Sequence, residues 1–167
     1  MKEKMGLLND KIMAGVILGI ISNIPKQIID FILYKLNFSD FFCWHTTAGV
    51  LISKEWIYNT HHGLIIGFFM DFFFAGVIGV SLIYFLRYLG EGEYLFSKGV
   101  GFSIIIWVTL CIMIVDQRLS MYHTLFDPWH AYHSFIDHTT HGIVATYLIL
   151  KYAKSTVTPK DKKSPSD

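Results

Sequence analysis

Residues 63–85 read GLIIGFFMDFFFAGVIGVSLIYF, an apolar run that a single charged residue, Asp71, interrupts. A helix needs about 20 mostly apolar residues to cross a bilayer, and this stretch meets that requirement. Three further stretches approach it, at about 12–36, 100–115 and 133–152. The sequence therefore predicts an all-α, polytopic membrane protein, built as a bundle of four transmembrane helices.

The composition excludes several classes of protein. Hydrophobic residues make up 53% of the chain and aromatic residues 16%, which is more than soluble globular domains contain. The net charge is only +1 and lysines gather at both ends of the chain, so nucleic acid is not an expected partner. Cys43 and Cys111 form neither a CxxC pair nor a disulfide framework, and we interpret both as packing residues.

The remaining segments predict how the chain is divided. The basic N-terminus resembles a signal peptide without a cleavage site, so we expect it to remain as the first span. Pro25 should kink or break that helix. The aromatic-rich residues 37–62 predict a segment lying along the membrane interface. Residues 1–154 then form the transmembrane domain, and residues 155–167 form a disordered cytoplasmic tail.

Basic residues indicate the orientation, because the short cytoplasmic loops of membrane proteins carry an excess of lysine and arginine. With four spans, one side holds only Lys35, Lys54 and Arg118. We therefore expect a multi-pass protein of the plasma membrane with both termini in the cytoplasm. The basic residues on the side of the termini are Lys2, Lys4, Lys11, Arg87, Lys98, Lys151, Lys154, Lys160, Lys162 and Lys163.

The same topology sends all the histidines to the outer half of the protein. Within residues 127–142, DPWHAYHSFIDHTTHG, four residues lie within about 80° of one another on a helix that turns about 100° per residue. Imidazole and carboxylate ligands suit zinc, iron, copper or nickel, and haem is the less favoured cofactor. The four are His130, His133, Asp137 and His141, and the facing ligands that we expect are His61 and His62.

Two other interpretations of these histidines stay open. No HExxH signature is present, so no known metalloenzyme motif supports a metal. The histidines could be amphipathic residues at the membrane boundary that bond to neighbouring side chains and backbone. They could also respond to protons, because imidazole titrates near neutral pH.

Ionisable residues within the spans form a second candidate site. A charge in the bilayer interior is costly, so such residues usually face the protein interior and pair. Lys26 and Asp30 are spaced i, i+4 and could pair with each other. Asp71 has no local partner, and Lys26 or a protonated histidine of the last span could supply one. The residues that we expect to line an outward-facing polar cleft are Asn23, Lys26, Asp30, Asp71, Asp137 and His141.

The opening LNDKIMAGVILGIISNIPKQIIDFI and the His141-Gly142 pair before the last span resemble small bacterial multi-pass membrane proteins of the YqhR-like type. That resemblance implies a membrane location and no particular activity. Thr140-His141 is similar to a Thr-His pair near an apolar helix in membrane-bound metal-dependent hydrolases.

Three functions follow from these patterns. The favoured hypothesis is a component that binds or transports a metal ion or small ligand in the outward-facing cleft. The alternative is a structural or interaction subunit, either a homo-oligomer or part of a larger membrane complex. The third is a membrane metalloenzyme, which would need three ligands, an open coordination position and a nearby acid or base.

Overall fold

The computed structural model describes residues 6–38, 42–49, 51–52, 56–57, 61–89, 94–115 and 128–158, with the backbone alone at 111–115, 128 and 130. Regular structure within these ranges is entirely helical, so the prediction of an all-α protein is confirmed. The helices are α2 (Lys11–Lys35), α3 (Cys43–Ala48), α5 (His61–Leu89), α6 (Leu95–Val115), α7 (Pro128–Tyr152) and α8 (Lys154–Val157).

Two of the helices, α2 and α5, are long and apolar enough to cross a membrane. Helix α6 contains a shorter apolar stretch, Leu95–Leu110. Helices α6 and α7 each begin five residues before the spans expected at 100 and 133. Helix α2 is continuous through Pro25, so the chain does not break there.

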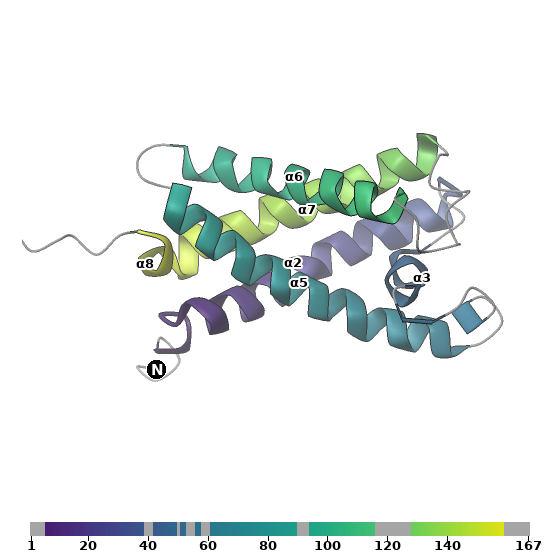
Figure 1. Ribbon diagram of the computed structural model, residues 1–167, viewed down its shortest axis with the longest axis horizontal. Helices are drawn as coiled ribbons and strands as arrows, with labels where there is room; N and C mark the ends of the chain where they lie inside the picture. The colour runs from purple at the N-terminus through teal and green to yellow at the C-terminus, as the bar shows by residue number, and fades with distance from the viewer. Residues whose placement is uncertain are drawn as a thin grey trace, which may run out of the picture.

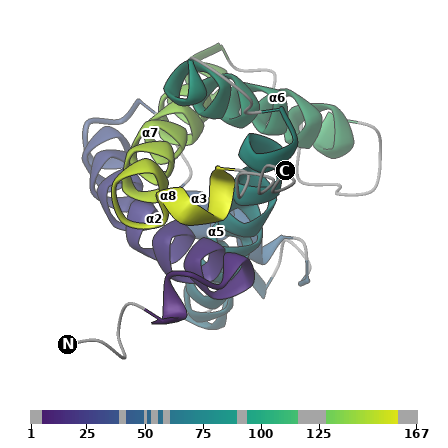
Figure 2. The same cartoon turned by 90° about the vertical axis from the view of Figure 1, so that its left-hand side faces the viewer.

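Helix α2 lies between α5 and α7, and α6 packs against the other side of α7 (Figure 1). Viewed from the end that carries α8, the four long helices surround a common axis (Figure 2). Contacts of Gly19 with Ala75 and of Lys26 with Asp71 show that α2 and α5 are antiparallel. Helices α2 and α7 are antiparallel as well, because Asp30 contacts His133 whereas Gly19 contacts His141.

Small residues allow α2 and α5 to approach closely. A Cβ atom at Gly15 would collide with the backbone of Val80, and one at Gly79 would collide with the carbonyl oxygen of Gly15 and the backbone of Gly19. The glycine pair at 15 and 19 therefore has the packing role that its spacing predicts. This contact holds the middle of α2 against α5 and sets which of their side chains meet.

The chain returns to the end of the bundle where it starts. Ser155 Oγ donates a hydrogen bond of 3.1 Å to Asn9 Oδ1, and Arg87 Nη1 donates one of 3.2 Å to the Thr156 carbonyl oxygen. Thr156 and Val157 of α8 are buried. The first residues of the stretch predicted as a disordered tail, 155–157, therefore lie in α8 and pack against the bundle. Residues 159–167 lie outside the described part of the chain.

The α2–α5 contact predicts opposite effects for two neighbouring glycines. Gly79→Ala should destabilise the protein by about 1–3 kcal/mol, because its Cβ would meet backbone that cannot move alone. Gly76→Ala should be neutral or slightly stabilising, because its Cβ would meet the nearest atom of α2 at 3.6 Å, an ordinary contact, and alanine favours helix. The midpoint of thermal unfolding in detergent compares the stability of the two variants. Equal midpoints would contradict this account of the contact.

Candidate metal centre

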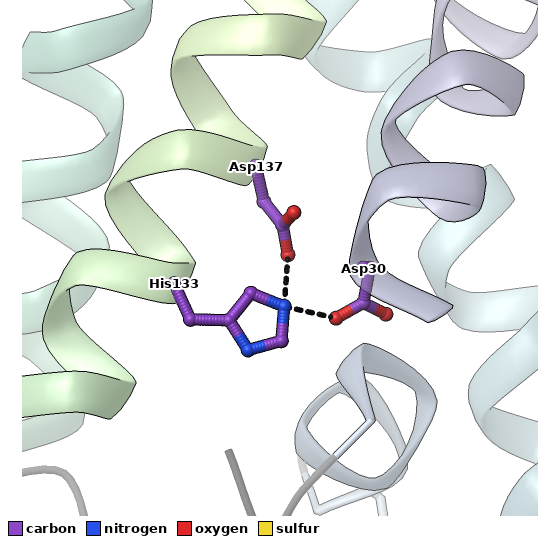
Figure 3. A group of neighbouring side chains, drawn as sticks. All are labelled: Asp30, His133 and Asp137. Carbon is purple, nitrogen blue, oxygen red and sulfur yellow. Dashed lines mark ion pairs between the residues drawn. The ribbon is translucent and has the colours of Figure 1, made fainter. Parts of the chain in front are cut away.

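Three side chains from two helices converge in the interior of the bundle (Figure 3). His133 and Asp137 lie one turn apart on α7, and Asp30 faces them from α2. His133 Nε2 is 2.8 Å from Asp30 Oδ1 and 3.5 Å from Asp137 Oδ2. The exposed fractions are 1% for Asp30 and 4% for each of the other two, so the group is almost completely removed from solvent.

This donor set has the composition of a metal site. One ligand atom from each of Asp30, His133 and Asp137 lies within 4.8 Å of the others. Tetrahedral zinc with bonds of about 2.0–2.2 Å needs ligand atoms about 3.4 Å apart. The 2.8 Å contact between His133 and Asp30 would open by about 0.6 Å to admit such an ion. Three protein ligands would leave one position for water or another ligand.

Asp137 adds a second observation. Its Oδ1 atom is buried and has no hydrogen-bond partner among the described residues. A buried carboxylate oxygen normally accepts at least one hydrogen bond, because leaving it unpaired in a low-dielectric interior is costly. A bound cation would satisfy it.

The short helix α3 positions the Asp30 carboxylate. The Cys43 backbone N–H donates a hydrogen bond of 3.0 Å to Asp30 Oδ2, which leaves Oδ1 directed at His133. Helix α3 is itself anchored on α5, because Thr47 Oγ1 donates a 3.0 Å bond to the Gly67 carbonyl and Gly67 lies against the Trp44 backbone. The segment that the sequence places at the membrane interface therefore orients a buried carboxylate.

Asp71 lies at the centre of a second polar group between α2 and α5. Lys26 Nζ donates a hydrogen bond of 2.8 Å to Asp71 Oδ1, and the amides of Asn23 and Gln27 donate to Oδ2. Lys26 thus neutralises Asp71. It is one of the two partners that the sequence offered for this carboxylate. The local Lys26–Asp30 pair is not the arrangement observed, because Asp30 pairs with His133 instead.

The predicted face of α7 is confirmed for the three residues whose side chains are described. His133, Asp137 and His141 are all buried. His141 Nε2 lies 3.3 Å from the Gly19 carbonyl oxygen, eleven residues before Asp30 on α2, so it lies apart from the group formed by Asp30, His133 and Asp137. The side chain of His130 lies outside the described residues, as does all of His123.

The facing ligands expected from α5 are not found at the site. His61 and His62 are exposed at the start of that helix, and the His62 ring lies 6.4 Å from that of Trp56. The residue that faces His133 and Asp137 is Asp30 of α2, which the sequence assigned to the polar cleft. Asn23, Lys26, Asp30 and Asp71 are buried and bonded within the bundle, so their side chains interact with protein groups.

Two participants were missed at the sequence level. Gln27 donates to Asp71 and also accepts a hydrogen bond from Cys43 Sγ at 3.2 Å. Its spacing of four from Asn23 and three from Asp30 could have placed it on the same helix face. Cys43 was interpreted as a packing residue, and no local signal indicates that its backbone N–H would reach Asp30, thirteen residues earlier.

Comparison with known proteins adds no functional information. The chain matches no protein-family model, no curated protein and no solved structure. The resemblance to YqhR-like membrane proteins therefore stays a prediction, and the functional argument depends on the geometry of this site.

The docking of α3 predicts a pH dependence through His45. Burial lowers the pKa of His45, and its Nδ1 accepts a hydrogen bond of 3.2 Å from the Phe42 N–H. Because the folded-state pKa lies below the unfolded value of about 6.5, the unfolded chain takes up the proton first as the pH falls. The stability contributed by neutral His45 is then complete above about pH 6.5 and is lost progressively below it.

His45→Gln should remove this component, because a glutamine at the third position of a helix can accept the same backbone hydrogen bond without titrating. Between neutral and mildly acidic pH, the midpoint of thermal unfolding should fall more for the parent than for the variant. Equal losses would show that His45 does not contribute to the pH dependence.

Proposed function

We propose that this chain is an integral membrane protein of four spans that binds a divalent transition metal between α2 and α7. The observation that carries the proposal is the convergence of Asp30, His133 and Asp137 in the interior of the bundle. Nitrogen and oxygen ligands in this combination suit zinc, iron or manganese.

The distribution of side chains supports a membrane setting. Apolar residues face outward, with exposed fractions of 57% for Ile28, 67% for Phe69 and 62% for Phe73, whereas Asp30 and Asp71 are exposed by 1% and 6%. In water this arrangement would expose large apolar side chains and bury charges. In a bilayer it is favourable, because lipid covers the apolar surface and the ionisable groups are enclosed by protein.

The charge balance supports a bound cation. Among the described residues, the buried carboxylates of Asp30, Asp71 and Asp137 accompany one buried lysine, Lys26. After Lys26 neutralises Asp71, two carboxylates remain beside His133. An uncompensated charge in a low-dielectric interior is strongly unfavourable. A divalent ion would neutralise both carboxylates, and His133 would serve as a neutral ligand.

The position of the chain ends supports an even number of crossings. The hydrogen bond between Ser155 and Asn9 joins the two ends of the described chain at one end of the bundle. Basic residues concentrate at that end, including Lys11, Arg87 and Lys154, which favours the cytoplasmic side. The proposed protein thus lies in the cell membrane with both termini in the cytoplasm, and the metal site lies toward the outer half.

The site favours binding or transport over catalysis. Asp71 of α5 is the candidate acid or base, but its carboxylate accepts hydrogen bonds from Lys26, Asn23 and Gln27. An enzyme would need a free acid or base beside the open coordination position. We therefore propose a metal-binding component, with transport as its physiological use.

Metal analysis of the purified protein tests this function. We expect one zinc or iron ion per chain by inductively coupled plasma mass spectrometry, and its loss in His133→Ala and in Asp137→Asn, because each change removes one of three ligands. His141→Ala and His62→Ala are the matched controls, since one histidine is buried outside the group and the other is exposed. Both controls should keep the metal.

A parent protein that stays metal-free after incubation with zinc, iron and manganese would refute the metal site. The histidines would then be structural or proton-responsive residues of a membrane subunit. Loss of metal in the control variants as well would indicate general unfolding, which circular dichroism of each variant would reveal.

Reporter fusions test the proposed topology. Alkaline phosphatase fused after Gly49 should be active, because that position would lie outside the cell, whereas a fusion after Leu89 should be inactive. Green fluorescent protein fused after Thr158 should fluoresce, since it folds in the cytoplasm. The reverse pattern would mean that the termini are outside. Active alkaline phosphatase at both Gly49 and Leu89 would rule out the four-span arrangement.

A further inference from the structure

The Asp71 carboxylate is surrounded by donors. It accepts from the Lys26 ammonium at 2.8 Å and from the side-chain amides of Asn23 and Gln27. Asp71 and Lys26 are exposed by 6% and 7%, and Asn23 by 2%. The three donors surround the Asp71 carboxylate, and the lysine ammonium at Oδ1 occupies the position that a metal ion bound to this carboxylate would take.

The same residues can supply oxygen ligands. The amides of Asn23 and Gln27 each carry a carbonyl oxygen beside the NH₂ group, and rotation by 180° would present the oxygen in place of the donor. Together with the Asp71 carboxylate, these groups form an all-oxygen donor set. Such sets suit hard divalent cations, including magnesium and manganese.

We propose that Asp71, Asn23 and Gln27 form a second cation site and that the Lys26 ammonium is its tethered occupant, which a divalent cation displaces. The second site uses none of the ligands of the metal group at Asp30, His133 and Asp137. It extends the proposed transport function, but it does not depend on metal binding at that group.

The surroundings of Lys26 give the displaced ammonium a destination. Lys26 is four residues from Asp30 on the same face of α2, and Asp137 faces Asp30 from α7. The buried Oδ1 of Asp137 has no hydrogen-bond partner among the described residues. The lysine side chain has a flexible four-carbon stem, so its ammonium can exchange one carboxylate for another about one helical turn away, about 5.4 Å along the axis.

This arrangement predicts competition between a fixed and a diffusible cation. While Lys26 holds Asp71, the second site is closed to metal ions. When Lys26 moves to the carboxylates of the metal group, it opens the second site and repels an ion from the first. One cation would then pass between two positions on successive turns of α2, with the lysine occupying whichever position is vacant.

The test is the number of Mn²⁺ ions bound per chain at saturation, measured by equilibrium dialysis of the detergent-solubilised full chain and elemental analysis. Lys26→Met removes the tethered cation and leaves the Asp71 carboxylate in place. We expect one ion for the parent and two for Lys26→Met. The double variant Lys26→Met with Asp71→Asn should return to one, and Lys26→Arg, which keeps a cation beside Asp71, should match the parent.

Adding His133→Ala separates the two proposals. In the Lys26→Met background it should lower the number of bound ions from two to one, because only the Asp71 site remains. If the parent binds no ion but Lys26→Met binds one that Asp71→Asn abolishes, the second site is supported and the metal group at His133 is refuted. If both the parent and Lys26→Met bind one ion, the metal group stands and the second site is refuted.

Folding of the variants supplies a further criterion. Lys26→Gln keeps a polar side chain and replaces the methionine variant if the latter aggregates. If neither neutral variant yields a monodisperse helical protein whereas Lys26→Arg does, Lys26 is a permanent structural partner of Asp71. That result would overturn the proposal, because a cation that cannot leave its site cannot exchange with a metal.

Discussion

The need to compensate buried carboxylates governs the arrangement of this protein. Asp30, Asp71 and Asp137 lie in the interior of a bundle whose outer surface is largely apolar. Each must find a cation or hydrogen-bond donors there, because burying an isolated charge is far more costly than any single packing contact gains. Lys26 satisfies Asp71 across the α2–α5 contact, and His133 lies between the other two carboxylates.

Helix α2 connects these groups because it contacts both α5 and α7. Its glycines bring the α5 backbone close, and this approach places Asp71 within reach of Lys26. One turn further along, Asp30 reaches across to α7 and accepts a hydrogen bond from the backbone of α3. Two polar groups thus share one helix face, and a change at either alters the electrostatic field at the other.

Several features followed from local pattern alone. The spacing of His133, Asp137 and His141 placed them on one face of α7, and all three are buried there. The four-residue spacing of Gly15 and Gly19 is one that permits close helix contact, and the structure contains that contact. These predictions succeeded because helical periodicity depends only on neighbouring residues, and the energetic cost of a buried charge restricts which face turns inward.

Pairing between distant segments was predicted less well. His61 and His62 were expected opposite α7 but are exposed, and the residue opposite His133 is Asp30. A spacing of i, i+4 suggested a Lys26–Asp30 pair, whereas Lys26 bonds to Asp71, 45 positions away, which the sequence offered only as an alternative. Such choices depend on how helices pack, because several partners are equally available to a charged side chain until the tertiary contacts are set.

The sequence by itself determined the helical class, two helices apolar enough to cross a membrane, and the inward face of α7. These properties follow from hydrophobicity and from a period of about 3.6 residues, which are local. Only the tertiary structure decided that Asp30 joins His133 and Asp137, that Lys26 neutralises Asp71, and that α3 orients the Asp30 carboxylate. The helix contacts decided them, because α2 lies between α5 and α7 and its glycines set the depth at which the side chains meet.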